Sequence, residues 1–189
     1  MLLKAEKIFD SIANYIGHIC AFLMMLMMLN VFYDVIMRYF FRSGSIGMQE
    51  MEWHLFSLVI LFGVSYTLKE DGHVRVDLVY DRLSAKKKAI INMVGVFLFL
   101  MPISLLVATG STEFVLESYN SGEASGDPGG LPYRWIIKSM IPLSFYILIF
   151  ISIGFFIKNL NVYRGEHGLA HEHQENLEGD YRTNVKETN

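Results

Sequence analysis

Long apolar stretches alternate with short polar segments along the chain. Residues 19–33, 94–109 and 140–157 contain no Asp, Glu, Lys, Arg or His. Apolar runs of this length are typical of helices that cross a lipid bilayer. The pattern therefore predicts an all-α integral membrane protein whose membrane domain, residues 14–160, has four transmembrane helices, at about residues 14–37, 53–68, 89–109 and 133–157. The second span is short and reaches the bilayer thickness only if residues 48–52 form its first turn.

Two segments outside the spans are amphipathic. In residues 1–13, apolar and charged positions alternate at helical spacing, so we expect this segment to lie along the inner membrane surface before the chain turns into the first span. A second short interfacial helix is expected at 77–83, with Asp77 as its N-cap, and Ser84 is a candidate cap for the third span. The polar residues 161–189 predict a disordered cytoplasmic tail.

The basic residues predict the orientation of the spans. Most Lys and Arg residues lie in the N-terminal segment, the second loop and the C-terminal tail. Only four lie on the other side of the predicted membrane, namely Arg38, Arg42, Arg134 and Lys138. Because cytoplasmic segments of membrane proteins carry the excess of Lys and Arg, both termini are expected in the cytoplasm, an N-in/C-in topology.

The composition excludes several classes of protein. Charged residues make up 19% of the chain, below the roughly 25% of an ordinary soluble domain, so a soluble enzyme is excluded. The formal net charge of −3 gives no basic face for nucleic acid. Cys20 is the only cysteine, which excludes a disulfide within the chain and a metal site built from cysteines.

Polar residues gather where the spans are expected to meet the outer membrane face. Such residues are informative because a span must neutralise or hide its polar groups. Asp34 and Arg38 are four residues apart and can form an ion pair on one helix face. Glu123, in the Gly-rich loop after the third span, is expected to be solvated and without consequence when removed. The candidate site residues of this cluster are Asn30, Asp34, Arg38, Glu50, Glu52, Glu113, Glu117, Arg134 and Lys138.

Two interpretations of this cluster stay open. The long side chains can be ordinary interfacial anchors that extend toward water. Alternatively, they form a network between helices that fixes the membrane domain and presents a polar rim to a partner. The depth of Asp34, one turn below Arg38, favours the network.

The middle of each predicted span carries no carboxylate and no base. Secondary transporters place solute and ion sites at that depth, commonly with broken helices, so this chain alone is a poor conductor of solute. Pro102 and Pro142 could kink the third and fourth spans, but proline is tolerated in membrane helices without a functional role.

A haem-binding helical bundle is an alternative from another class. It needs paired histidines inside the membrane, and His18 and His54 are the candidates. They are expected near opposite membrane faces, about 20 Å or more apart, so they cannot share one iron. His167, His171 and His173 lie in the polar tail, where a solvated segment is favoured over a metal site. We therefore predict no cofactor and no metal.

Four short motifs resemble those of the small, DctQ-like membrane subunit of tripartite ATP-independent periplasmic (TRAP) transporters. They are RYFF at 38–41 after Asn30, Glu50 and Glu52 opening the second span, GHVRVD at 72–77, and YRW at 133–135 leading to Lys138 and Pro142. They follow the order of the family and extend over roughly residues 10–160. The DPGGL loop at 127–131 resembles the longer-loop branch of the family, which is often linked to organic or 2-oxo acids.

The resemblance implies a partner rather than a reaction. It implies a location in the bacterial inner membrane, beside a large multi-span subunit that carries the solute and sodium sites. It also implies a periplasmic binding protein that delivers an acidic solute, with this chain as a non-catalytic scaffold. His73, Arg75 and Asp77 would hold the short cytoplasmic helix at the lipid headgroups. A stand-alone membrane scaffold or assembly protein is the alternative.

Overall fold

The computed structural model describes residues 2–70, 80 and 83–165, and the described regular structure is entirely helical. The helices are α1 (Leu2–Phe40), α2 (Ile46–Lys69), α4 (Ala85–Gly95), a π-helical turn η1 (Val96–Leu100), α5 (Met101–Asn120) and α6 (Trp135–Arg164). Because α4, η1 and α5 run on as one helix, four helices are long and apolar enough to cross a membrane. The prediction of four membrane helices is confirmed by the length and apolar composition of these helices.

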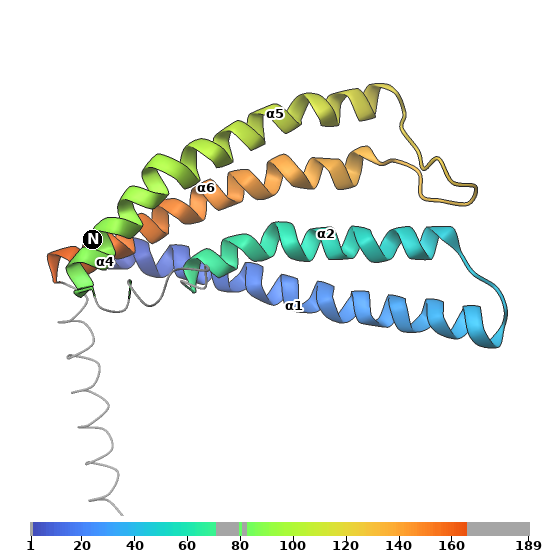
Figure 1. The fold of residues 1–189 in the computed structure, drawn as a ribbon, viewed down its shortest axis with the longest axis horizontal. Coiled ribbons are helices and arrows are strands. Elements are labelled where there is room, and N and C mark those ends of the chain that lie inside the picture. Colours follow the sequence, from blue (N-terminus) through green and yellow to red (C-terminus); the bar gives the residue numbers. More distant parts are fainter. Residues whose placement is uncertain (1, 71–79, 81–82, 166–189) are drawn as a thin grey trace, which may run out of the picture.

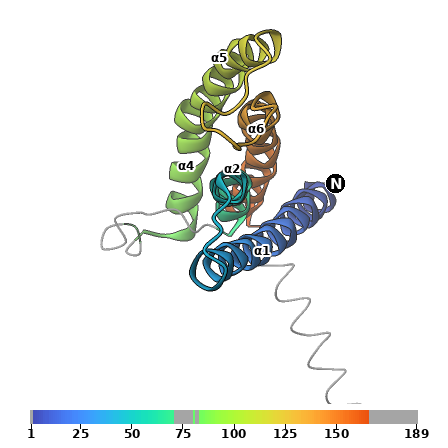
Figure 2. The same cartoon turned by 90° about the vertical axis from the view of Figure 1, so that its right-hand side faces the viewer.

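The helices are arranged with α2 and α6 in the middle. α1 packs mainly on α2, α2 packs on α6, and α6 packs on α5, while α1 also reaches α6. Figure 2 shows α1 and α5 on opposite sides of the α2–α6 pair. We call the end with the connections 41–45 and 121–134 the loop end, and the end with Leu2 and Gly165 the terminal end (Figure 1).

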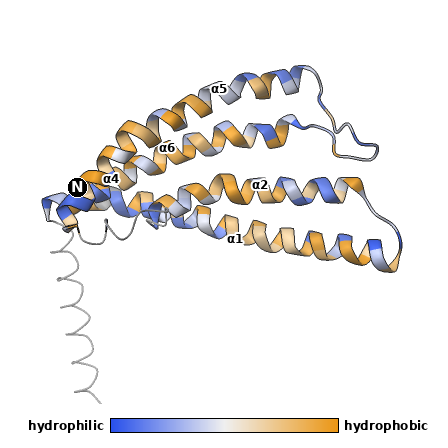
Figure 3. Ribbon diagram, in the orientation of Figure 1, coloured by the Kyte–Doolittle hydropathy of each residue, from blue (hydrophilic) through white to orange (hydrophobic). Residues whose placement is uncertain are grey.

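The core consists of two small apolar clusters around α6. Leu68 of α2, Val96 of η1 and Phe155 of α6 belong to one cluster, and Ala13 of α1 and Ile151 of α6 belong to the other. Many large apolar side chains stay exposed outside these clusters, and apolar residues dominate the middle of the helices (Figure 3). Exposure of this kind fits a lipid environment, in which outward-facing apolar groups need no cover.

Helix α1 is continuous, so the turn expected after residue 13 is absent. It is a single helix of 39 residues, about 58 Å long, with no break between the amphipathic segment and the first span. Phe9 stacks on Phe150 of α6, with ring centroids 4.8 Å apart, and the Glu6 carboxylate accepts a hydrogen bond from Asn161 Nδ2 at 2.7 Å. The face of α1 that carries Glu6 and Phe9 is therefore packed against α6, whereas Ile8 and Tyr15 of the predicted apolar face stay exposed.

The third span is longer than expected and contains a local irregularity. Its helix covers Ala85–Asn120 rather than 89–109. Ser84 occupies the N-cap position, but its side chain makes no capping hydrogen bond. The π-turn closes with Met101 N–H donating to the carbonyl of Val96, one residue before Pro102. A proline ring clashes with the carbonyl four residues earlier, and the wider π-turn relieves this clash.

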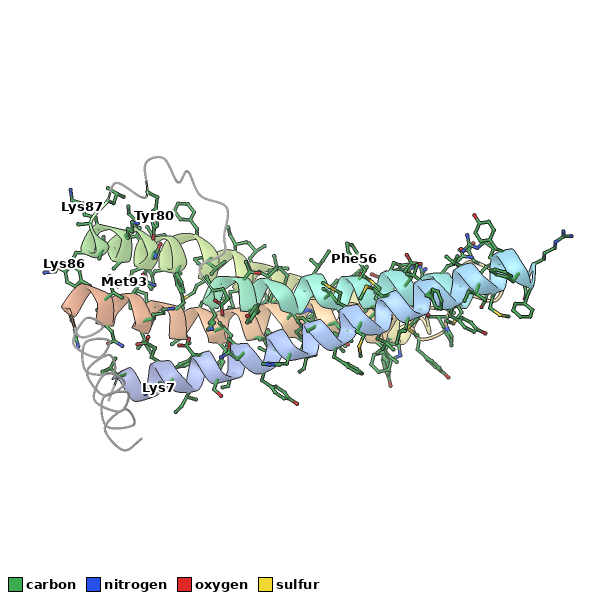
Figure 4. All side chains as sticks on the ribbon, turned by 90° about the horizontal axis from the view of Figure 1, so that it is seen from below. Lys7, Phe56, Tyr80, Lys86, Lys87 and Met93 are labelled. Atoms are coloured by element: carbon green, nitrogen blue, oxygen red, sulfur yellow. The ribbon has the colours of Figure 1, made fainter. Side chains whose placement is uncertain are left out.

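The structure describes only parts of the expected tail and of the expected helix 77–83. Helix α6 continues to Arg164, so residues 161–164 of the expected tail are helical. The rest of that tail and most of the expected helix 77–83 lie outside the described residues. Lys7, Lys86 and Lys87 all lie at the terminal end (Figure 4).

Gly154 tests the packing of α1 on α6. A Cβ at Gly154 would lie 2.6 Å from Cγ of Phe9, closer than atoms of packed side chains approach. We expect Gly154→Ala to destabilise the protein by about 1–3 kcal/mol, because the two helices must move apart. The Tm in one detergent measures the effect. Gly63→Ala is the control, since nothing lies within 4 Å of its Cβ position. Equal Tm values for both variants would contradict the close approach.

Candidate functional site

The carboxylate of Glu50 is the centre of a polar cluster at the loop end. Glu50 lies in the first turns of α2 and is 5% exposed. Its Oε1 accepts hydrogen bonds from the Ser125 hydroxyl and from Nη2 of Arg134 at 3.3 Å. Its Oε2 accepts the N–H of Leu131 at 2.6 Å. One carboxylate thus joins α2, the 121–134 connection and the start of α6.

The 121–134 connection folds back onto α2 to supply these donors. Ser125 N–H donates to the carbonyl of Leu131 at 3.1 Å, which brings the two Glu50 donors to the same place. Gly130 passes so close that a Cβ there would lie 2.9 Å from Oε2 of Glu50 and closer still to Ser125. A glycine is therefore required at 130, because a side chain would push the connection off the carboxylate.

A second ion pair ties the connection to α6. The Lys138 ammonium donates to the Glu123 carboxylate, and Arg134 N–H donates to the Glu123 carbonyl at 3.0 Å. The hydrogen bond from Lys138 lowers the pKa of the Glu123 carboxyl. The expectation that Glu123 is solvated is wrong, because its carboxylate is paired and partly buried, while the effect of its removal stays a prediction. The spacing of Glu123 and Lys138 along the chain does not predict this contact, because the fold of the 121–134 connection brings the two side chains together.

Helix α1 carries a separate polar group on the face toward α2. Asn30 Nδ2 donates to the carbonyl of Met48 at 2.9 Å, across the α1–α2 contact. The Asp34 carboxylate is 3% exposed and pairs with Arg38, whose side chain is half exposed. The structure thus contains the pair that the four-residue spacing predicted.

The terminal end is held by side-chain amides. Asn92 of α4 donates through Nδ2 to Oδ1 of Asn159 on α6 at 2.9 Å, and Tyr80 donates to Asn92 Oδ1 at 3.1 Å. Asn161 is fully buried and donates to Glu6 of α1. No sequence pattern above predicted these contacts, although asparagines near the ends of apolar helices were a usable signal. The amides join α4 and α1 to α6.

The sequence profile of the DctQ component of tripartite ATP-independent periplasmic transporters matches residues 27–161. This match extends over most of the chain and includes both loop-end groups. The chain belongs to the DctQ family.

Two DctQ relatives come from Haemophilus influenzae, and the name of each assigns it to the small permease of a TRAP transporter. One is 29% identical over 161 residues, which are 82% of this chain and 97% of the relative. The other is 26% identical over 147 residues, which are 77% of this chain and 87% of the relative. No solved structure matches the chain at a significant level. The chain is therefore a membrane-embedded TRAP transporter subunit.

The structure of this DctQ chain divides the expected network into two parts. Asn30, Asp34 and Arg38 form the α1 part, and Glu50, Arg134 and Lys138 belong to the cluster around the connection. Three other candidates form no side-chain hydrogen bond or ion pair within the described part of the chain, namely Glu52, Glu113 and Glu117. The candidates His73, Arg75 and Asp77 lie outside the described residues.

The exposures of Asp34 and Arg38 predict unequal effects of their removal. Arg38→Ala leaves a buried carboxylate without its partner, which costs up to about 3 kcal/mol. Asp34→Ala leaves an arginine that is already half exposed and can turn to water, so its cost is smaller. The double variant Asp34→Ala, Arg38→Ala strands no charge and recovers part of the loss. Thermal unfolding of the three variants in one detergent measures this order, and equal, additive effects would contradict it.

Proposed function

We propose that this DctQ-family chain is a non-catalytic scaffold subunit of a sodium-coupled TRAP transporter that imports a carboxylate-type solute. One observation carries the proposal: charged side chains lie near the helix ends, and the middle of each span has none. Residues 55–68, 89–112 and 139–157 contain no Asp, Glu, Lys, Arg or His. A sodium-coupled carboxylate carrier needs polar groups at that depth, so a large multi-span subunit supplies them.

The proposed orientation is N-in/C-in in the bacterial inner membrane. It rests on the basic residues, since Lys7, Lys86 and Lys87 lie at the terminal end. The loop end then faces the periplasm, where a solute-binding protein delivers its cargo. The 121–134 connection, which contacts α2 through Glu50 and α6 through Glu123, is the part of this face that such a protein would meet.

The exposed apolar surface supports a partner inside the membrane. Met24, Met25 and Met28 on α1 are each about half exposed. Methionine side chains adapt to irregular neighbours, which suits a broad helix–helix contact with a large subunit. The same surface also contacts lipid wherever the large subunit leaves it uncovered.

Reconstitution tests the proposed function. Proteoliposomes would contain the large subunit with or without this chain, and the binding protein loaded with labelled solute would be added outside under an inward sodium gradient. We expect solute uptake only when both membrane subunits are present, and we expect the two subunits to elute together in detergent. Equal sodium on both sides is the control and should abolish uptake.

Two results would contradict the proposed function. Separate elution of the two subunits, together with unchanged uptake when this chain is left out, would favour a stand-alone scaffold. Uptake by this chain without the large subunit would overturn the non-catalytic role.

A further inference from the structure

A groove runs along the outer surface between α2 and α6, below the 121–134 connection. Its volume is about 380 Å³, and most of its lining is apolar, with Trp53, Phe56 and Ile60 on one side and Ile137 and Ile141 on the other. Phe56 projects from α2 on the side away from α1 (Figure 4). The groove is therefore an apolar surface depression that begins near the membrane surface and runs toward the middle of the bilayer.

Two cations stand at the mouth of this groove. Arg134 and Lys138 both line it, whereas the carboxylates of Glu50 and Glu123 that pair with them do not. The groove is therefore lined by two cations whose charges are balanced by carboxylates outside the lining. The Lys138 ammonium also lies over the ring of Phe114 on α5, 3.9 Å from its centroid. The Arg134 guanidinium also lies over the ring of Trp53, 5.7 Å from its centroid, so arginine and tryptophan meet at the depth where membrane proteins place both.

Arg134 has donor capacity that the protein leaves unused. Its Nε is buried and has no hydrogen-bond partner among the described residues. Its bond to Glu50 is a single contact of 3.3 Å through Nη2, although a guanidinium has five N–H donors arranged to match an anionic oxygen pair. The guanidinium therefore keeps N–H donors that its bond to Glu50 does not use.

We propose that the groove binds one phospholipid from the leaflet at the loop end. The lipid phosphate accepts hydrogen bonds from Arg134 and Lys138, and one acyl chain lies between α2 and α6 along Phe56, Ile60 and Ile141. The order of the lining, cationic first and apolar deeper, matches the order of polarity in a phospholipid. The inference goes beyond the scaffold role and does not depend on it.

Quenching of tryptophan fluorescence tests the proposal. The chain has two tryptophans, Trp53 in the groove and Trp135 against Tyr119. The full-length chain with Trp135→Phe reports on the groove alone. In phosphate-free maltoside micelles, we would titrate phosphatidylglycerol brominated on its acyl chains, and separately diacylglycerol with the same brominated chains. We expect saturable quenching by the phospholipid, with an apparent affinity at least about tenfold higher than for diacylglycerol.

Two matched variants distinguish the effect of the Lys138 charge from the effect of the Lys138–Glu123 ion pair. Lys138→Gln removes both the groove cation and the Lys138–Glu123 pair, whereas Glu123→Gln breaks the same pair and leaves the lysine charge at the groove. We expect Lys138→Gln to weaken phospholipid quenching severalfold and Glu123→Gln to preserve it. The variant Trp53→Phe, which keeps Trp135, should show only weak, non-saturable quenching.

Three outcomes would overturn the proposal. Equal quenching by phospholipid and diacylglycerol would mean that no phosphate is recognised. Equal loss in Lys138→Gln and Glu123→Gln would mean that the loop contact, not the cation, matters. Loss of phospholipid quenching when the chain is purified in complex with its large subunit would mean that protein covers the groove.

Discussion

Glu50 is a buried carboxylate near the start of a membrane helix, and a buried carboxylate needs hydrogen-bond donors. This need determines how the loop end is built. An unpaired charge at this place would be costly, so the protein surrounds it with a hydroxyl, a backbone N–H and a guanidinium. The path of the 121–134 connection follows from it. Gly130 is needed for the close approach, and Tyr133 adopts a left-handed conformation (φ 61°) where the chain re-enters the membrane at α6.

The two ends of the molecule satisfy their polar groups in different ways. The loop end uses full charges in pairs, Glu50 with Arg134 and Glu123 with Lys138. The terminal end combines amides with charges: Asn159 accepts a hydrogen bond from the Asn92 amide, and the Glu6 carboxylate accepts one from Asn161. Between them the helices meet through small apolar clusters, and wide apolar surfaces stay open. Polar contacts at both ends therefore fix the order of the helices, while the middle is left free for lipid or for a partner.

The sequence predicted what depends on local spacing. Apolar runs predicted the four spans, and the four-residue spacing of Asp34 and Arg38 predicted their pair. Contacts between distant segments could not be predicted from the same patterns. Glu6 and Asn161 are 155 positions apart, and the amphipathic segment around Glu6 has the same periodicity whether it faces lipid or α6. The expected solvation of Glu123 was wrong because a Gly-rich stretch indicates a loop but not the direction in which the loop folds.

The central claim is that Glu50 holds the α1–α2 pair in place against the α5–α6 pair, and a distance between spin labels tests it most directly. In a Cys20→Ser background, labels at Met51→Cys and Ile136→Cys occupy exposed sites on α2 and α6 at the loop end. We expect one narrow distance distribution in the otherwise unaltered chain. Adding Glu50→Ala should broaden and lengthen it, whereas the neighbouring control Glu52→Ala should leave it unchanged. An unchanged distribution in Glu50→Ala, or equal broadening in both variants, would contradict the claim.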